Sequence, residues 1–177
     1  GGAGPGKPRL AGGLAERAHE TGSATVLSAT HGSRPSPASG LAGMLTRFGR
    51  LDGLPRRHVR KRVTRLLAAR GRVSDEEIDA VTEMVSPATG RLRRTGNRLI
   101  RFASPGERYT VLAGVLEILA RERPGVLVLD DVHYGADARG FCRQLQRSGE
   151  RAVPIRVVRT ARCGPLVEDR RSVGEGK

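Results

Sequence analysis

The 177-residue sequence is poor in aromatic residues: it has no tryptophan, two tyrosines and three phenylalanines. A hydrophobic core in this chain therefore has to be built mainly from leucine, valine and alanine. No stretch reaches the roughly 18 consecutive apolar residues that a transmembrane helix needs, so we expect no membrane-spanning segment. The chain opens in a glycine-rich segment that has neither an initiator methionine nor the apolar core of a secretory signal. We therefore expect it to be a piece of a longer protein.

Cysteine is scarce as well, with Cys142 and Cys163 the only two. Two cysteines are too few for a disulfide framework, and the chain has no CxxC motif or Cys/His cluster of the kind that binds zinc. We expect both to be small buried hydrophobic residues. Cysteine usage of this kind favours a reducing compartment, and we expect the chain to be cytoplasmic.

Lysine is also rare: Lys7, Lys61 and Lys177 are the only lysines, and the other 29 of the 32 basic residues are arginine. Against 18 acidic residues this composition gives a net charge of +14. One explanation is a general composition bias of the source organism, because arginine, alanine and glycine are abundant together in the sequence. The other is a surface that binds phosphate or nucleic acid.

The best place for such a surface is the range 50–72, where nine basic residues accompany a single acid, Asp52. The stretch also has the apolar spacing of an ordinary amphipathic helix with a solvated charged face. The shortage of aromatic residues that could stack on bases counts against an arginine-rich nucleic-acid binder. If the stretch is only a solvated face, its binding to duplex DNA should be non-specific and vanish by physiological salt. The basic residues are Arg50, Arg56, Arg57, Arg60, Lys61, Arg62, Arg65, Arg70 and Arg72, and the apolar ones are Val59, Val63, Leu66 and Leu67.

Apolar periodicity predicts a succession of strands and helices. After a glycine-rich turn, a first helix has Leu10, Leu14 and Ala18 on one stripe. Ser74 with Glu77, and Ser104 with Pro105 and Glu107, are start signals of later helices, each with a capping box. Strands are expected at 24–30, 126–129 and 154–160, helices at 41–51, 54–70, 74–85, 104–119 and 136–147, and loops at 31–40 and 86–103.

The first chemical motif is Gly1-x-x-x-x-Gly6-Lys7, which has the spacing of a phosphate-binding loop. Glycines let successive backbone N–H groups converge on a phosphate, and the helix that follows adds its positive end. Lys7 would reach the terminal phosphates. Position 8 in this pattern is Ser or Thr, whose hydroxyl binds Mg²⁺, but here it is Pro8, which offers neither a hydroxyl nor a backbone N–H.

The second motif is the apolar run 126–129 followed by Asp130 and Asp131. An unbroken apolar run indicates a strand that is buried on both faces of a parallel sheet. Carboxylates at the end of such a strand point into the crevice where ligands bind. Asp130 would hold Mg²⁺, and Asp131 would orient or deprotonate an attacking water.

The third motif closes the strand at 154–160 with Thr160-x-Arg162. Thr160 would lie near a terminal phosphate, and Arg162 would contact that phosphate with its forked guanidinium. The alternative is that Arg162 is one more surface arginine among many.

Together these segments resemble the bacterial P-loop ATPase modules of the AAA/STAND type, found in large ATP-dependent regulators and beside signalling Ser/Thr kinases or LuxR-like transcription factors. Residues 1–10 are similar to the family's GxxGxGKSRL. Residues 129–137, Leu-Asp-Asp-Val-His-Tyr-Gly-Ala-Asp, are similar to its LDD segment, with Tyr134 in place of the usual Trp. Thr160-x-Arg162 matches the family's strand-end T-x-R, so the resemblance covers residues 1–162.

The resemblance implies an α/β fold, with a parallel-sheet P-loop NTPase core and helices on both faces. The core would be incomplete, because the family's first strand and lid are missing. A partial ATPase domain would span 1–164, with a helical insert at about 40–86 and a linker at about 87–103, and 165–177 would be a disordered tail. The missing strand would leave a hydrophobic edge of the sheet uncovered, which is an aggregation hazard.

The resemblance also implies the ligands ATP and Mg²⁺ and a nucleotide-dependent conformational switch in a bacterial signalling or transcription-regulating protein. The expected partner is an output or kinase domain in the same parent chain, with no membrane and only weak nucleic-acid binding. Because Pro8 removes a metal ligand, a degenerate relict that does not hydrolyse ATP is an open alternative. Gly1, Gly4, Gly6, Lys7 and Thr160 would bind the nucleotide, Asp130 the metal, and Asp131 and Arg162 would be catalytic.

Overall fold

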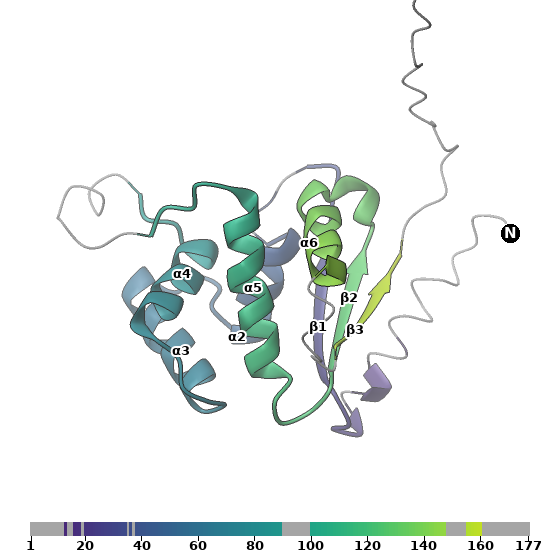
Figure 1. The fold of residues 1–177 in the computed structure, drawn as a ribbon, viewed down its shortest axis with the longest axis horizontal. Helices are drawn as coiled ribbons and strands as arrows, with labels where there is room; N and C mark the ends of the chain where they lie inside the picture. Colours follow the sequence, from purple (N-terminus) through teal and green to yellow (C-terminus); the bar gives the residue numbers. More distant parts are fainter. Residues whose placement is uncertain are drawn as a thin grey trace, which may run out of the picture.

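Three parallel strands form the sheet: β1 (Thr25–Thr30), β2 (Gly125–Asp130) and β3 (Ile155–Arg159), in the order β1-β2-β3 (Figure 1). Thr30 pairs with Asp130, and Leu129 pairs with Arg159, so the carboxyl ends of all three strands meet at one edge. The expected α/β class with a parallel sheet is confirmed. The computed structural model describes residues 13, 16–18, 20–34, 36, 38–89, 100–147 and 155–160.

The central strand β2 has the burial that its apolar run predicts. Leu127 and Leu129 are fully buried on one face of the sheet, and Val128 is 6% exposed on the other. The outer strand β1 alternates instead, because Leu27 is buried while Ser28 is exposed. A parallel strand with covered faces needs apolar side chains on both, whereas an outer strand needs them mainly on the face toward the helices.

The helices lie close to the predicted positions. They are α2 (Gly40–Gly49), α3 (Arg56–Ala68), α4 (Asp75–Val85), α5 (Pro105–Leu119) and α6 (Ala136–Arg147), and a single 3₁₀ turn, η2 (Val132–Tyr134), follows β2. Helix α2 ends at Arg50, which adopts the left-handed conformation with φ of 50°. Its backbone N–H donates to the carbonyls of Arg47 and Thr46, and this satisfies the end of the helix.

Two caps show how local sequence sets helix starts. At α4 the predicted capping box is confirmed: the Ser74 hydroxyl accepts from Glu77 N at 3.1 Å, and Glu77 Oε2 accepts from Ser74 N at 2.8 Å. At α5 the Ser104 hydroxyl accepts from Glu107 N at 3.4 Å, but the Glu107 carboxylate accepts from Ala103 N at 2.8 Å. The predicted box at α5 is therefore wrong in its second bond, because the carboxylate reaches one residue farther back.

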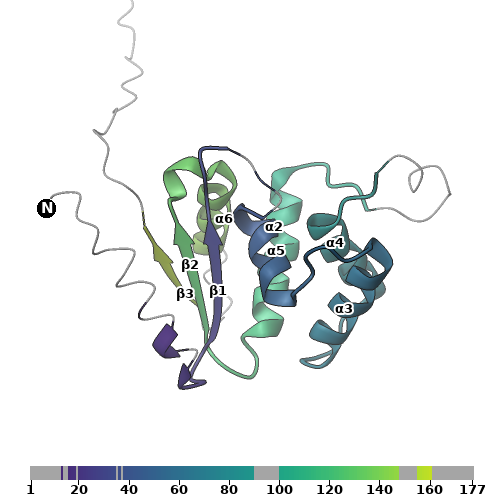
Figure 2. The same ribbon diagram turned by 180° about the vertical axis from the view of Figure 1, so that it is seen from behind.

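Helices α2, α5 and α6 lie on one face of the sheet, and α3 and α4 form an outer layer beyond them (Figures 1 and 2). Helix α2 packs on β1, α5 packs on α6, and α3 packs on α4. Helix α2 therefore packs directly on the sheet, and the α3–α4 pair is added outside it. That helices cover both faces of the sheet stays a prediction. The first predicted helix falls within residues 1–20, most of which lie outside the described part of the chain.

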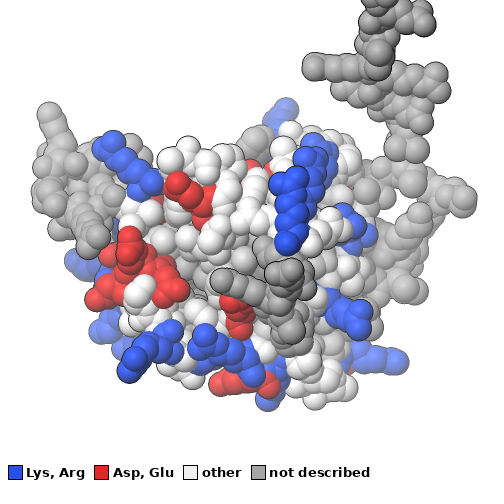
Figure 3. Space-filling view, viewed as in Figure 1, with Lys and Arg blue, Asp and Glu red and all other residues white. Residues whose placement is uncertain are grey.

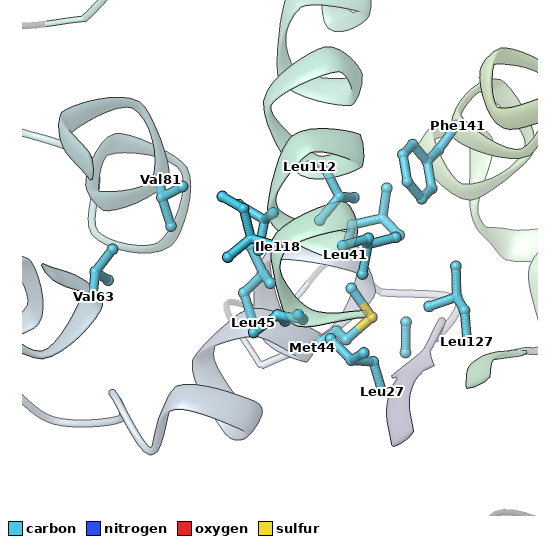
Figure 4. Close-up of a cluster of buried hydrophobic side chains, with 14 of the residues drawn as sticks. Leu27, Leu41, Met44, Leu45, Val63, Val81, Leu112, Ile118, Leu127 and Phe141 are labelled. Carbon is cyan, nitrogen blue, oxygen red and sulfur yellow. The ribbon is translucent and has the colours of Figure 1, made fainter. Parts of the chain in front are cut away.

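The core lies between the sheet and its helices. Figure 4 shows Leu41 and Met44 of α2 beside Leu27 and Leu127 of the sheet, and Val63 and Val81 of the outer layer farther away. Phe141 of α6 is fully buried in the same cluster. Leucine and valine dominate this cluster, as the shortage of aromatic residues predicts.

Cys142 is buried beside Phe141, at 5% exposure, which confirms the expectation that it is a small core residue. Burial also raises the pKa of the Cys142 thiol, an effect that Arg159 partly opposes, so the thiolate is disfavoured. Cys163 lies outside the described residues. Among the helices that are described, none combines the length and the hydropathy needed to cross a membrane.

Candidate functional site

The carboxyl edge of the sheet brings together Asp130, Asp131 and Thr160, which we call the sheet-edge cluster. Thr160 continues the pairing of β3, because its N–H donates to Leu129 O at 2.9 Å and its carbonyl accepts from Val132 N at 3.2 Å. This backbone pairing places the Thr160 hydroxyl in a hydrogen bond with Asp130 Oδ1. Two segments 30 residues apart in the sequence are thus locked side by side.

Asp130 and Asp131 have different environments within the cluster. Asp130 Oδ1 accepts from Asp131 N at 3.0 Å as well as from Thr160. Asp131 adopts the left-handed conformation, with φ of 53°, which is uncommon for a residue other than glycine. Its carboxylate oxygen lies 3.9 Å from Nδ1 of His133, too far for a hydrogen bond. The strand therefore ends at Asp130, and the backbone turns at Asp131.

The donor set of the sheet-edge cluster suits a hard cation. Its side chains offer only oxygen atoms, and Mg²⁺ in proteins is held by one or two carboxylates together with water and substrate phosphates. No hydrogen bond reaches Asp130 Oδ2 from any residue that the structure describes, so this oxygen is the natural ligand atom. Among the described residues, no group of three or more His, Cys, Asp or Glu side chains is placed to hold a metal, at this edge or elsewhere.

A histidine that the sequence motifs do not include completes this edge. His31 follows β1 directly and is only 6% exposed. Its Nδ1–H donates to Asp130 O at 2.9 Å, and its backbone N–H donates to the same carbonyl at 3.1 Å. The only sequence signal for this residue is a histidine immediately after a strand, at the same edge as the acids. Its Nε2 is buried and has no partner in the described part of the chain.

His31 also lines a hollow of about 930 Å³ between the starts of α2, α5 and α6. On its wall, Tyr109 donates to Asp137 Oδ1 at 3.1 Å, and Arg108 lies 3.7 Å from the same oxygen. Burial raises the pKa of the Tyr109 phenol, and the Asp137 carboxylate adds to the effect. The lining of the hollow therefore includes the neighbouring side chains of Arg108 and Asp137 and the buried ring of His31.

The structure describes the positions of only three of the predicted site residues. It places Asp130, Asp131 and Thr160 together, with Thr160 bonded to an acid side chain. The residues expected to bind phosphate, Gly1, Gly4, Gly6 and Lys7, lie outside the described residues, as do Pro8 and Arg162.

Comparisons with known proteins give no further guide: no family model, no curated protein and no solved structure matches this chain. The family resemblance therefore rests on the residues of the three motifs.

Proposed function

We propose that this chain is an ATP-binding module of the AAA/STAND type, in which nucleotide acts as a conformational switch in a bacterial signalling or transcription-regulating protein. The observation that supports the proposal is the contact between Asp130 and Thr160 at the carboxyl edge of a parallel sheet. In open α/β sheets ligands bind outside the carboxyl ends of the strands. A pair of acids at the end of one strand, tied to a hydroxyl at the end of the next, is suited to a metal-bound phosphate group.

Each member of the sheet-edge cluster has a separate part in this proposal. Asp130 offers a metal ligand through Oδ2, and Thr160 fixes the rotation of that carboxylate by bonding to Oδ1. Asp131 leaves the strand in the left-handed conformation, and its carboxylate would orient an attacking water. Bound Mg²⁺ would neutralise phosphate charge, which lowers the barrier to attack by the water.

The phosphate-binding part of the proposal rests on the sequence. Backbone N–H groups at Gly4 and Gly6 would hold phosphate oxygens, and Lys7 would neutralise their charge. Pro8 lacks the hydroxyl that would complete the metal site. We therefore expect weak ATP binding that depends little on Mg²⁺.

The decisive test is an ATP titration of the 177-residue chain, by calorimetry or with a fluorescent ATP analogue, with and without Mg²⁺. The variant Lys7→Ala is expected to lose binding, because the charge that faces the phosphates is removed. Lys177→Ala removes the same charge at the other end of the sequence and is the matched control, expected to bind like the wild type.

The outcomes separate the alternatives. Equal affinity of Lys7→Ala and Lys177→Ala for ATP would show that Lys7 does not hold phosphate, and the ATP-binding proposal would fail. Tight binding that depends strongly on Mg²⁺ would show that Pro8 does not impair the metal site. Binding without any turnover would favour the relict that binds nucleotide but does not hydrolyse it.

A further inference from the structure

Helix α3 has three different faces, and the first of them is apolar. Val59, Val63 and Leu67 recur every four residues and are at most 2% exposed. They pack α3 into the outer layer of the core. Burial of this stripe fixes the rotation of the helix, and therefore decides where each of its basic side chains lies.

The second face turns its arginines toward acids on α4. Arg56 lies 2.7 Å from Glu83, and Arg60 lies 2.8 Å from Asp75 and 2.6 Å from Asp79. Hydrogen bonds to Asp79 and Asp75 raise the pKa of Arg60. On the side of the molecule seen in Figure 3, acidic and basic side chains are accordingly mixed. These arginines are neutralised within the fold and are not available to a polyanion.

The third face is different, because its basic side chains have no acid partners among the described residues. His58, Lys61, Arg62 and Arg65 follow the spacing i, i+3, i+4, i+7 and therefore share one side of α3. They line a hollow of about 710 Å³, which we call the basic groove. The remaining lining is Arg50 at the end of α2, Gly49, and the apolar side chains Phe48, Leu54 and Leu66.

We propose that the basic groove binds single-stranded nucleic acid through its phosphates, without sequence preference. From His58 to Arg65 the helix advances about 10 Å. Along a stacked, helical strand the rise is about 3.4 Å per phosphate, so the row faces about three consecutive phosphates of a strand in that form. Fixed cationic side chains in a row gain affinity by releasing counterions from the strand, and this gain needs no base contacts.

The shape of the basic groove favours a flexible strand over other polyanions. Its walls are cationic, while Phe48, Leu54 and Leu66 provide an apolar surface within the same hollow. A single strand has unpaired bases that can reach such a surface, as in proteins that combine a basic groove with base contacts. A bilayer surface does not enter a hollow of this size, and in a duplex the bases are stacked inside. The proposal shares no residue with the sheet-edge cluster and does not depend on ATP binding.

The test is the affinity of the 177-residue chain for a fluorescent oligothymidine of about 15 nucleotides, measured by anisotropy at 50 and 200 mM salt. Neutralisation of about three phosphates predicts a loss of roughly 20-fold in affinity between these salt concentrations. The double variant Lys61→Gln/Arg65→Gln keeps polar side chains with part of each aliphatic stem but removes two charges from the groove. It is expected to bind about tenfold more weakly at 50 mM salt and to have a shallower salt dependence.

The matched control is Arg143→Gln/Arg147→Gln, which removes two exposed charges at the same i, i+4 spacing on α6. The two double variants therefore have the same net charge. The control is expected to bind like the wild type. Equal losses in the two double variants would show that diffuse charge, and not the groove, attracts the strand. Tighter binding to duplex than to oligothymidine, or Lys61-dependent binding to anionic lipid vesicles without oligothymidine binding, would also overturn the proposal.

Folding of each variant is checked by its thermal unfolding midpoint. If the double variant in the groove has a lowered unfolding midpoint, the single variant Arg62→Gln provides the test of binding. Arg62 is exposed and makes no ion pair with a described residue, so this change should not affect folding. Wild-type affinity of Arg62→Gln would then contradict the proposal. Because the groove is independent of nucleotide, Lys7→Ala is expected to keep full oligothymidine binding even where it loses ATP.

Discussion

His31 and Asp130 are joined twice across two neighbouring strands, since both the backbone N–H and Nδ1–H of His31 donate to the Asp130 carbonyl, at 3.1 and 2.9 Å. The histidine thereby extends the ladder between β1 and β2 beyond the last paired residues, Thr30 and Asp130. The two hydrogen bonds make His31 a structural support of the sheet-edge cluster.

Replacing His31 with alanine is expected to lower the free energy of unfolding by about 2–3 kcal/mol, because one hydrogen bond and the packing of a buried ring are lost. Chemical denaturation of His31→Ala measures this effect. His58 is exposed, so His58→Ala is the control and should change stability by less than about 0.5 kcal/mol. Equal stabilities of the two variants would contradict the role assigned to His31.

Gly135 makes room for the same ring. A Cβ atom at this position would lie 2.4 Å from Cδ2 of His31, although the backbone φ of −103° suits any residue. Gly135→Ala should therefore destabilise the fold by about 1–3 kcal/mol through steric overlap alone. Gly114→Ala is the control, because a Cβ there meets nothing within 4 Å, and in a helix interior this change should stabilise by up to about 1 kcal/mol.

A double-mutant cycle identifies the cause of that cost. If the overlap is with the His31 ring, Gly135→Ala should cost much less in the His31→Ala background than in the wild type. The measurement is again the free energy of unfolding in denaturant. Additive costs in the double variant would place the overlap elsewhere.

The capping box at the start of α4 gives a third prediction. Ser74→Ala should cost about 1 kcal/mol of stability, since Glu77 N and the Glu77 carboxylate both lose a partner. Ser33 is exposed and serves as the control, with Ser33→Ala expected to be neutral. Thermal or chemical unfolding of the two variants provides the comparison. A neutral Ser74→Ala would mean that the packing of α4 on α3, and not its cap, determines where the helix begins.

Tyr109 predicts a dependence of stability on alkaline pH. Burial, with a contribution from Asp137, raises the pKa of its phenol in the folded state above the ordinary value of 10.0. The folded protein therefore holds the proton more tightly than the unfolded chain, and the resulting stability is complete below pH 10 and is lost as the pH rises through the folded pKa.

The variant Tyr109→Phe has no phenolic proton, so its stability should fall less steeply than that of the wild type between about pH 9 and 11. Thermal unfolding at closely spaced pH values measures the two slopes. Tyr134→Phe removes a hydroxyl from a ring that is 51% exposed and is the control for the loss of a phenol at the surface. Parallel curves for Tyr109→Phe and the wild type would refute the assignment.

The elements that were predictable from sequence are those that local signals determine. The apolar run at 126–129 identifies β2 as a buried parallel strand, and the Ser74–Glu77 pair identifies the start of α4. Both signals lie within a few residues of sequence, so they can be recognised without knowledge of the fold. The Glu107 carboxylate shows the limit even of local signals, since it bonds to Ala103 N instead of Ser104 N.

Contacts between distant segments were much less predictable. The bond from His31 to the Asp130 carbonyl joins residues 99 positions apart, and no spacing rule connects a histidine after one strand with a carbonyl of another. The charged faces of α3 depend likewise on where α4 packs, so composition alone leaves Arg60 and Lys61 equivalent. Only the fold shows that Arg60 is paired with acids and that Lys61 lines the basic groove.

The last prediction concerns Pro8, where the phosphate loop departs from its pattern. Pro8→Ser restores a hydroxyl for Mg²⁺ and a backbone N–H for phosphate, and hydrogen bonds to a charged group are worth roughly 1.5–3 kcal/mol. The affinity for Mg·ATP in calorimetric titrations should therefore rise about tenfold or more, and turnover should appear because Asp130 and Thr160 are already in contact.

Asp131→Asn in the Pro8→Ser background should abolish turnover and spare most of the binding, since its proposed partner is the attacking water. Asp52→Asn removes an exposed acid instead and should leave turnover intact. If Pro8→Ser changes neither affinity nor phosphate release, residues 1–7 are not a working phosphate loop, and the sheet-edge cluster belongs to a relict that has lost its nucleotide.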